Sequence, residues 1–202
     1  MYLITNTSYK KEMGFELDFL HALQELHNPE LDRLMLFITR LGDGNFIWFL
    51  ISIVMIIIPS MKKVFNKKCD DECKDKLNER RNVGFTIIIA LFLSVILVNL
   101  CMKNIFNRLR PFQVDTSIIS IIMPSDSSFP SGHTSSAFAA AVSIFLTNKK
   151  AGIMALILAV LIAFSRMYFF VHFPTDILGG ILTGVICAKI ATVFVKKTPL
   201  DS

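Results

Sequence analysis

The apolar residues of this chain are gathered into long blocks that short polar segments separate. Residues 44–61 and residues 82–102 contain no charged side chain. Each stretch is close to the roughly 20 residues that an α-helix needs to cross a bilayer. The pattern predicts an all-α membrane bundle with about five transmembrane helices, at residues 34–59, 82–102, 131–147, 151–168 and 177–195.

The segment before the first predicted span has a different pattern, because acidic residues interrupt its apolar ones. The apolar residues recur at helical spacing: Phe15, Leu17, Phe19, Leu20, Leu23 and Leu26. With Glu16 and Asp18 between them, residues 13–27 predict an amphipathic helix that lies at the membrane interface. Pro29 suits the first turn of the next helix. Residues 1–30 therefore form an N-terminal tail and an interfacial helix.

The first predicted span is interrupted by Gly42-Asp43-Gly44. Two glycines this close together either kink one long helix or form a turn between two helices. We expect one span over residues 34–59. For Asp43, a polar turn at the bilayer surface is favoured over a functional role.

Composition agrees with a membrane protein. The chain has 202 residues, of which 53% are hydrophobic and 18% are charged, whereas about a quarter of the residues of a soluble domain are charged. No internal repeat or change of composition marks a domain boundary. We therefore expect one integral-membrane domain over residues 1–202.

The formal net charge of +5 does not indicate a nucleic-acid partner, because the basic residues lie at the ends of the apolar blocks. Short basic loops face the cytoplasm. This rule places the predicted loop at residues 60–82, the turn at 148–150 and the end at 196–197 inside the cell. Residues 103–130 and 166–176 then share the outer face of the plasma membrane.

The four cysteines, at positions 69, 73, 101 and 187, do not form a disulfide framework. Cys101 and Cys187 fall within predicted spans, and Cys69 and Cys73 lie in the charged loop. A zinc site usually needs four ligands, and no histidine lies near this pair. We expect reduced cysteines, no metal and no cofactor.

The first of three polar clusters is Lys103 followed by Arg110-Pro111. On a continuous helix, a spacing of seven residues would place both cations on one face. An arginine fork and a lysine point charge together suit a phosphate group. Taken alone, the pair is more typical of cations that anchor a helix end by reaching to the membrane surface.

The second cluster is Phe129-Pro130-Ser131-Gly132-His133. Ser131 is a good N-cap for the third span. Gly132 leaves the free backbone N–H groups of the first turn open to an anion, and His133 would stand beside it. A simple helix cap with an interfacial histidine is the alternative.

The third cluster runs from Ser165-Arg166 through His172 to Asp176. A carboxylate that holds one ring nitrogen of His172 would leave the other nitrogen free as a nucleophile. Ionisable groups beside a membrane helix are costly and usually functional. A structural histidine–carboxylate hydrogen bond would explain two of these residues but not the coincidence of three clusters.

Together, Lys-x6-Arg-Pro, Pro-Ser-Gly-His and Ser-Arg-x5-His-x3-Asp resemble the three-part signature of the type 2 phosphatidic acid phosphatase and vanadium haloperoxidase superfamily. The match covers residues 103–176, about a third of the chain. The chain is most similar to the small bacterial integral-membrane branch of the superfamily, because the motifs lie on predicted spanning helices.

The resemblance implies a metal-free lipid phosphatase. His172 would attack phosphorus to form a phosphohistidine, Asp176 would orient His172, and His133 would be the general acid and base. The phosphate oxygens would be held by five residues: Lys103, Arg110, Ser131, Gly132 and Arg166.

The implied substrate is a lipid phosphate or diphosphate, with undecaprenyl diphosphate as the first choice. Some dedicated undecaprenyl diphosphatases of the superfamily resemble Pro-Ser-Asp-His where this chain has Gly132. Phosphatidylglycerophosphate, phosphatidate and diacylglycerol diphosphate therefore stay open, as does phosphotransfer to another acceptor. A transporter is the non-enzyme alternative, although it would favour charges near the midplane. The oligomeric state is left open.

Overall fold

The computed structural model describes residues 13–65 and 70–197, and these residues form helices and loops without a β-strand. The α-helices are α2 (Gly14–Gln24), α3 (Pro29–Leu41), α4 (Phe46–Phe65), α5 (Asp71–Val95), α6 (Lys103–Phe106), α7 (Pro111–Val114), α8 (Gly132–Thr147), α9 (Lys149–Tyr168) and α10 (Pro174–Lys197). A 3₁₀ turn, η1 (Asp43–Asn45), precedes α4, and a π-helical segment, η2 (Ile96–Met102), joins α5 to α6.

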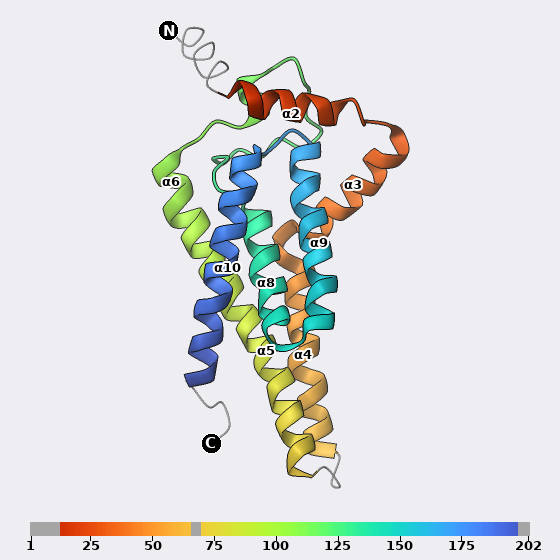
Figure 1. Cartoon of the computed structure of the whole chain (residues 1–202), viewed down its shortest axis with the longest axis vertical. Helices are drawn as coiled ribbons and strands as arrows, with labels where there is room; N and C mark the ends of the chain where they lie inside the picture. Colours follow the sequence, from red (N-terminus) through yellow and green to blue (C-terminus); the bar gives the residue numbers. More distant parts are fainter. Residues whose placement is uncertain (1–12, 66–69, 198–202) are drawn as a thin grey trace.

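Four helical stretches of the described residues are long and apolar enough to cross a membrane: Asp43–Phe65, Asp71–Val114, Lys149–Tyr168 and Pro174–Lys197. The shorter helix α8, with 16 residues, stands among them and packs against α5, α9 and α10 (Figure 1). The expected all-α membrane bundle is confirmed. The five predicted spans correspond to these four stretches and α8.

Helix α8 is central because its small side chains let the neighbouring helices approach closely. Ala137, Ala139, Ala140 and Ala141 are all fully buried. On α10, a Cβ atom at Gly184 would lie 2.4 Å from the backbone oxygen of Ser135 on α8. Close packing through small residues is the usual way in which helices associate in a membrane.

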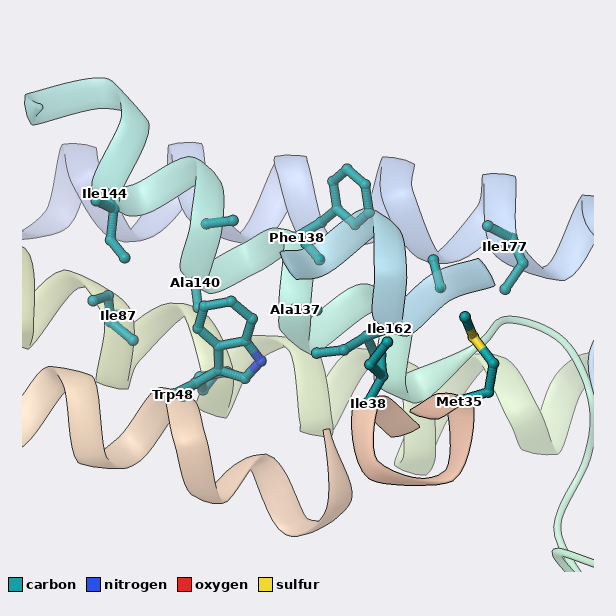
Figure 2. Close-up of a cluster of buried hydrophobic side chains, with 14 of the residues drawn as sticks. Met35, Ile38, Trp48, Ile87, Ala137, Phe138, Ala140, Ile144, Ile162 and Ile177 are labelled. Carbon is teal, nitrogen blue, oxygen red and sulfur yellow. The ribbon is translucent and has the colours of Figure 1, made fainter. Parts of the chain in front are cut away.

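The largest hydrophobic core joins α8 to five other helices, among them α10 through Ile177. Figure 2 shows Trp48 of α4, Ile87 of α5 and Ile162 of α9 converging on the alanine face of α8. Met35 and Ile38 of α3 close the same core at one end. The core thus fixes α3 and α9 relative to the first turn of α8.

The expected bounds of the first span, residues 34–59, are wrong, because α3 and α4 are separate helices and the apolar stretch runs over Asp43–Phe65. Asn28 caps α3 by accepting a 2.9 Å hydrogen bond from the backbone N–H of Leu31. The helix ends before Gly42, and Gly44 has a positive φ of 56°. Figure 1 shows α3 running obliquely from α2 toward α4.

The expected loop over residues 60–82 is also largely helical. Helix α4 continues to Phe65, and Asp70 caps α5 by accepting a 2.9 Å hydrogen bond from the N–H of Cys73. Lys67, Lys68 and Cys69 lie outside the described residues. Cys73 is disulfide-bonded, so the expectation of a reduced thiol at this position is wrong.

The predicted amphipathic helix is α2, which lies across one end of the bundle (Figure 1). Leu17, Leu20 and Leu23 are buried against Phe170 and Phe173 of the loop between α9 and α10. The apolar face of α2 therefore packs on the loop that carries the third polar cluster.

Candidate active site

His172 lies in the short loop between α9 and α10, and Asp176 lies in the first turn of α10. The distance from His172 Nδ1 to Asp176 Oδ2 is 3.5 Å. The other ring nitrogen, Nε2, lies 3.3 Å from Nη1 of Arg110. One nitrogen of His172 therefore faces a carboxylate and the other faces a cation.

His172 is almost completely buried, with 2% of its surface exposed. Phe170 and Phe173, on either side in the chain, are fully buried as well. Burial lowers the pKa of His172 to about 3, and the nearby Arg110 charge acts in the same direction against the hydrogen bond to Asp176. A neutral imidazole with an unshared electron pair is the form that can act as a nucleophile.

Asp176 is fully buried and is held by several donors. Its Oδ2 accepts hydrogen bonds from Ser128 Oγ at 2.5 Å and from the backbone N–H of Phe173 at 2.8 Å. Its Oδ1 accepts one from Arg108 Nη1 at 2.5 Å. These donors satisfy the buried carboxylate and fix its orientation toward His172.

Arg110 caps the short helix α7, and its guanidinium is buried. Nη1 donates to the carbonyl oxygen of Val171 at 2.8 Å, beside its contact with His172. Nη2 donates to Oδ1 of Asp126 at 2.6 Å. The guanidinium therefore connects the His172 loop to the segment that precedes α8.

Lys103 forms an ion pair with the other carboxylate oxygen of Asp126. Although burial opposes the charge of Asp126, its hydrogen bonds and charge interactions with Lys103 and Arg110 lower its pKa. The Asp126 carboxylate thus bridges the two cations of the first cluster.

The two cations do not converge in the way that their spacing predicts. The helix that carries Lys103 ends at Phe106, because Asn107 adopts a left-handed conformation with φ of 41°. The expectation that Lys103 and Arg110 share one helix face is therefore wrong. The chain turns between them, and the π-helical segment η2 leads directly into Lys103.

Ser131 caps α8 as the sequence predicts. Its fully buried hydroxyl oxygen accepts hydrogen bonds from the N–H of Thr134 at 3.4 Å and from Thr134 Oγ1 at 2.9 Å. Gly132 begins the helix, and a Cβ atom there would lie 3.9 Å from Lys103 Nζ. The free N–H groups of the first turn of α8 are therefore close to a cation.

His133 Nε2 lies 2.9 Å from Asp43 Oδ1, in the turn between α3 and α4. Arg166 of α9 is buried, and its Nη1 donates a 2.6 Å hydrogen bond to Thr39 Oγ1. Its charge interacts with those of Arg110, Asp43 and Asp126. The second cluster, at His133, and the third cluster, at Arg166, therefore lie close to the cations of the first cluster.

A pocket of about 210 Å³ opens beside these groups. Its walls come from the turn after α3, from α5 with η2, from the start of α6, and from the start of α8 with the loop that precedes it. They include Gly42, Lys103, Asp126, Gly132 and His133. A pocket at a helix N-terminus, with Lys103 in its wall, suits an anion of the size of phosphate.

Comparison with known proteins decides the family. The family model described as PAP2 superfamily matches residues 82–199, more than half of the chain. The chain belongs to the PAP2 superfamily.

Relatives and folds agree with this assignment. The chain is 27% identical over 177 residues to an undecaprenyl-diphosphatase of Sulfolobus acidocaldarius, covering 87% of the chain and 76% of the relative. It is 26% identical over 175 residues to the undecaprenyl-diphosphatase BcrC of Bacillus subtilis, covering 86% and 80%. The PAP2 phosphatidylglycerolphosphate phosphatase of B. subtilis has a similar fold, with a TM-score of 0.70, 23% identity and coverage of 100% and 95%. The protein is a phosphatase of the PAP2 type that resides in a membrane.

Sequence reasoning missed three residues that contact the candidate site residues Arg110 and Asp176: Arg108, Asp126 and Ser128. All three lie in the irregular stretch between Lys103 and Ser131, where no helical period relates one position to another. Arg108 could have been identified from the sequence. It lies two residues before Arg110, and a third cation in the same motif needs a partner. For Asp126 and Ser128, no local pattern indicates partners on other elements.

Proposed function

We propose that this PAP2 protein hydrolyses a lipid diphosphate, undecaprenyl diphosphate first, on the extracytoplasmic face of the membrane through a phosphohistidine. The observation that carries the proposal is the setting of His172. Its Nδ1 faces Asp176, and its Nε2 faces Arg110 at the phosphate-binding cluster. This is the arrangement that an activated histidine nucleophile needs.

In the first step, Nε2 of His172 attacks the terminal phosphorus as the bond to the leaving oxygen breaks. Asp176 stabilises the positive charge that develops on the imidazole ring. His133 gives a proton to the leaving oxygen. In the second step, His133 takes a proton from water, which attacks phosphorus and releases His172.

The charge of the transferring phosphoryl group is balanced by the surrounding donors. Lys103, Arg110 and Arg166 supply cations, and the N-terminus of α8 at Gly132 supplies backbone N–H groups. Ser131 positions those N–H groups by capping the helix. Positioning and charge stabilisation account for most of the catalysis in phosphoryl transfer, so the proposal needs no metal ion.

The orientation rests on the distribution of basic residues. Within the described part of the chain, Lys62 and Lys63 end α4, Lys149 begins α9, and Lys196 and Lys197 end α10. All of these positions lie at or toward the end of the bundle opposite α2 and the candidate site (Figure 1). The positive-inside rule assigns that end to the cytoplasm and the site to the outside.

Undecaprenyl diphosphate is the preferred substrate because relatives with this activity in their names align over most of the chain. Gly132, in place of an aspartate, keeps phosphatidylglycerophosphate, phosphatidate and diacylglycerol diphosphate as alternatives. An acceptor other than water would make the same site a phosphotransferase. A transporter is disfavoured because the charged cluster lies at one end of the bundle.

The test is phosphate release by the purified protein in detergent, with EDTA present throughout. The panel contains undecaprenyl diphosphate, phosphatidylglycerophosphate, phosphatidate and diacylglycerol diphosphate. We expect release from undecaprenyl diphosphate to be fastest and to vanish in His172→Ala. His21→Ala is the matched control, since His21 lies on α2 and pairs with Asp115 instead of Asp176. Full activity of His172→Ala would refute the mechanism, and loss of activity in EDTA would contradict a metal-free reaction.

The orientation has its own test in intact cells. Thr116→Cys, in the exposed loop near the site, and Glu72→Cys, at the far end, are introduced singly into a protein without its native cysteines. A membrane-impermeant maleimide should label the first variant before lysis and the second only after lysis. The reverse pattern would overturn the proposed orientation.

A further inference from the structure

The turn between α3 and α4 contacts His133 at two points. Nε2 of His133 lies 2.9 Å from the Asp43 carboxylate. A Cβ atom at Gly42 would lie 2.9 Å from Cδ2 of the same ring, so only glycine fits against it without a shift. The turn also supplies Gly42, Gly44 and Asn45 to the wall of the polar pocket.

The Asp43–His133 pair is not explained by stability alone. The side chain of Asp43 is 60% exposed, and an ion pair at such a position contributes only about 0–1 kcal/mol. A carboxylate at the start of α4 also interacts favourably with the helix dipole. That interaction does not require Asp43 to face a histidine on another helix.

The contacts determine which nitrogen of His133 is free. Cδ2 and Nε2 are adjacent ring atoms, and the vertex opposite the bond between them is Nδ1. Because Gly42 and Asp43 hold the Cδ2–Nε2 edge, Nδ1 faces away from the turn. No hydrogen bond to Nδ1 of His133 is formed within the described residues.

We propose that Asp43 is a positioning residue that holds Nε2–H of His133 and leaves Nδ1 as the nitrogen that exchanges protons with the reacting groups. This inference rests on the proposed function, which it deepens. The site then contains two aspartate–histidine pairs, with Asp176 orienting the nucleophile His172 and Asp43 orienting the acid and base His133.

The proton balance of the two steps follows. As the bond between His172 Nε2 and phosphorus forms, the bond from phosphorus to the leaving oxygen breaks, and the proton on Nδ1 of His133 passes to that oxygen. Water then attacks phosphorus, the phosphorus–nitrogen bond breaks, and one water proton returns to Nδ1. Asp43 keeps its charge throughout and stabilises the imidazolium form of His133.

The kinetic test uses ³²P-labelled 4-nitrophenyl phosphate, whose leaving group needs no proton, so that only the water step depends on His133. In Asp43→Ala we expect kcat to fall on the order of 10²-fold, within the range of a general acid and base, while KM changes little. The base-stable phosphohistidine should accumulate. His133→Ala should behave in the same way, Asp43→Asn should be intermediate, and the far-end control Asp71→Asn should match the wild type.

Two kinetic outcomes would overturn the inference. One is a wild-type kcat in Asp43→Ala. The other is a fall in kcat with a raised KM and no phosphohistidine, which would make Asp43 a residue for phosphate binding or folding. If the wild-type protein releases phosphate from no substrate, the proposed function fails, and the state of the His133 ring decides the inference by itself.

The ring state is read by nitrogen NMR of protein labelled with ¹⁵N-histidine, in which the four histidines are assigned through single variants. In the neutral wild-type ring we expect the proton on Nε2 of His133. Asp43→Ala should shift the tautomer equilibrium toward Nδ1–H. A ring spectrum that is the same in both proteins would overturn the inference whatever the activity.

Discussion

Arg108 Nη1 lies 2.5 Å from Oδ1 of Asp176, and together the two side chains join the first motif to the last. Nη2 of the same guanidinium lies 2.7 Å from Glu16 Oε2 on α2. The guanidinium also stacks over the ring of Phe173, 4.3 Å from its centroid. Arg108 is therefore the connection between α2, the His172 loop and the carboxylate that orients His172.

Replacing Arg108 with methionine should destabilise the folded protein and lower its rate of turnover. Asp176 is fully buried, and removing the partner of a buried charge costs about 3–5 kcal/mol. We expect a lower unfolding midpoint in detergent and a reduced kcat. Arg33→Met, which removes an exposed pair with Glu30, is the control. An unchanged midpoint would mean that Ser128 and the Phe173 amide satisfy Asp176 without Arg108.

Asp126 occupies the position between Lys103 and Arg110 that the proposed mechanism assigns to phosphate oxygens. Its interactions with these cations keep its pKa low, so it stays ionised from pH 5 to pH 8. We expect Asp126→Asn to bind vanadate and phosphate about 10-fold more tightly, equivalent to about 1.4 kcal/mol. The measurement is competitive inhibition of turnover, with Asp18→Asn on α2 as the control. Weaker binding of vanadate and phosphate would show that Asp126 positions Lys103 and Arg110 instead of competing with the anion for them.

The buried His172 should make the protein acid-sensitive. Its pKa in the folded protein is about 3, below the value of about 6.5 for an exposed histidine. Between these values the unfolded chain binds more protons, so stability falls as the pH falls through that window. The free energy of unfolding at pH 5 should be about 2 kcal/mol lower than at pH 7.5.

His172→Asn should therefore lose about 2 kcal/mol less than the wild type between pH 7.5 and pH 5. Thermal unfolding in detergent at both values measures the difference. His21→Asn, a change at the half-exposed His21, controls for the loss of any histidine. An identical pH dependence in wild type and His172→Asn would show that His172 is already charged in the folded state.

The membrane bundle and the residues of the three motifs were predictable because their signals are local. Apolar blocks of spanning length indicate helices, Pro29 suits a first helical turn, and Ser131 is a recognisable cap. The connections were less predictable. The sequence favours a surface turn for Asp43 because its partner, His133, is 90 positions away. The pairing of Arg108 with Asp176 spans 68 positions and depends on a loop without periodicity.

The close contact between α8 and α10 is the last relationship that a substitution can test, because each helix carries part of the site at its N-terminal end. A Cβ atom at Gly184 would lie 2.4 Å from the Ser135 oxygen and 2.9 Å from the Ala139 nitrogen. Gly184→Ala should push the helices apart and cost about 1–3 kcal/mol, with a lower kcat because Ser131 and Asp176 separate. Gly14→Ala, where a Cβ atom meets nothing within 4 Å, is the matched control for thermal unfolding and turnover. Equal behaviour of the two variants would mean that α10 can shift along α8 without disturbing the site.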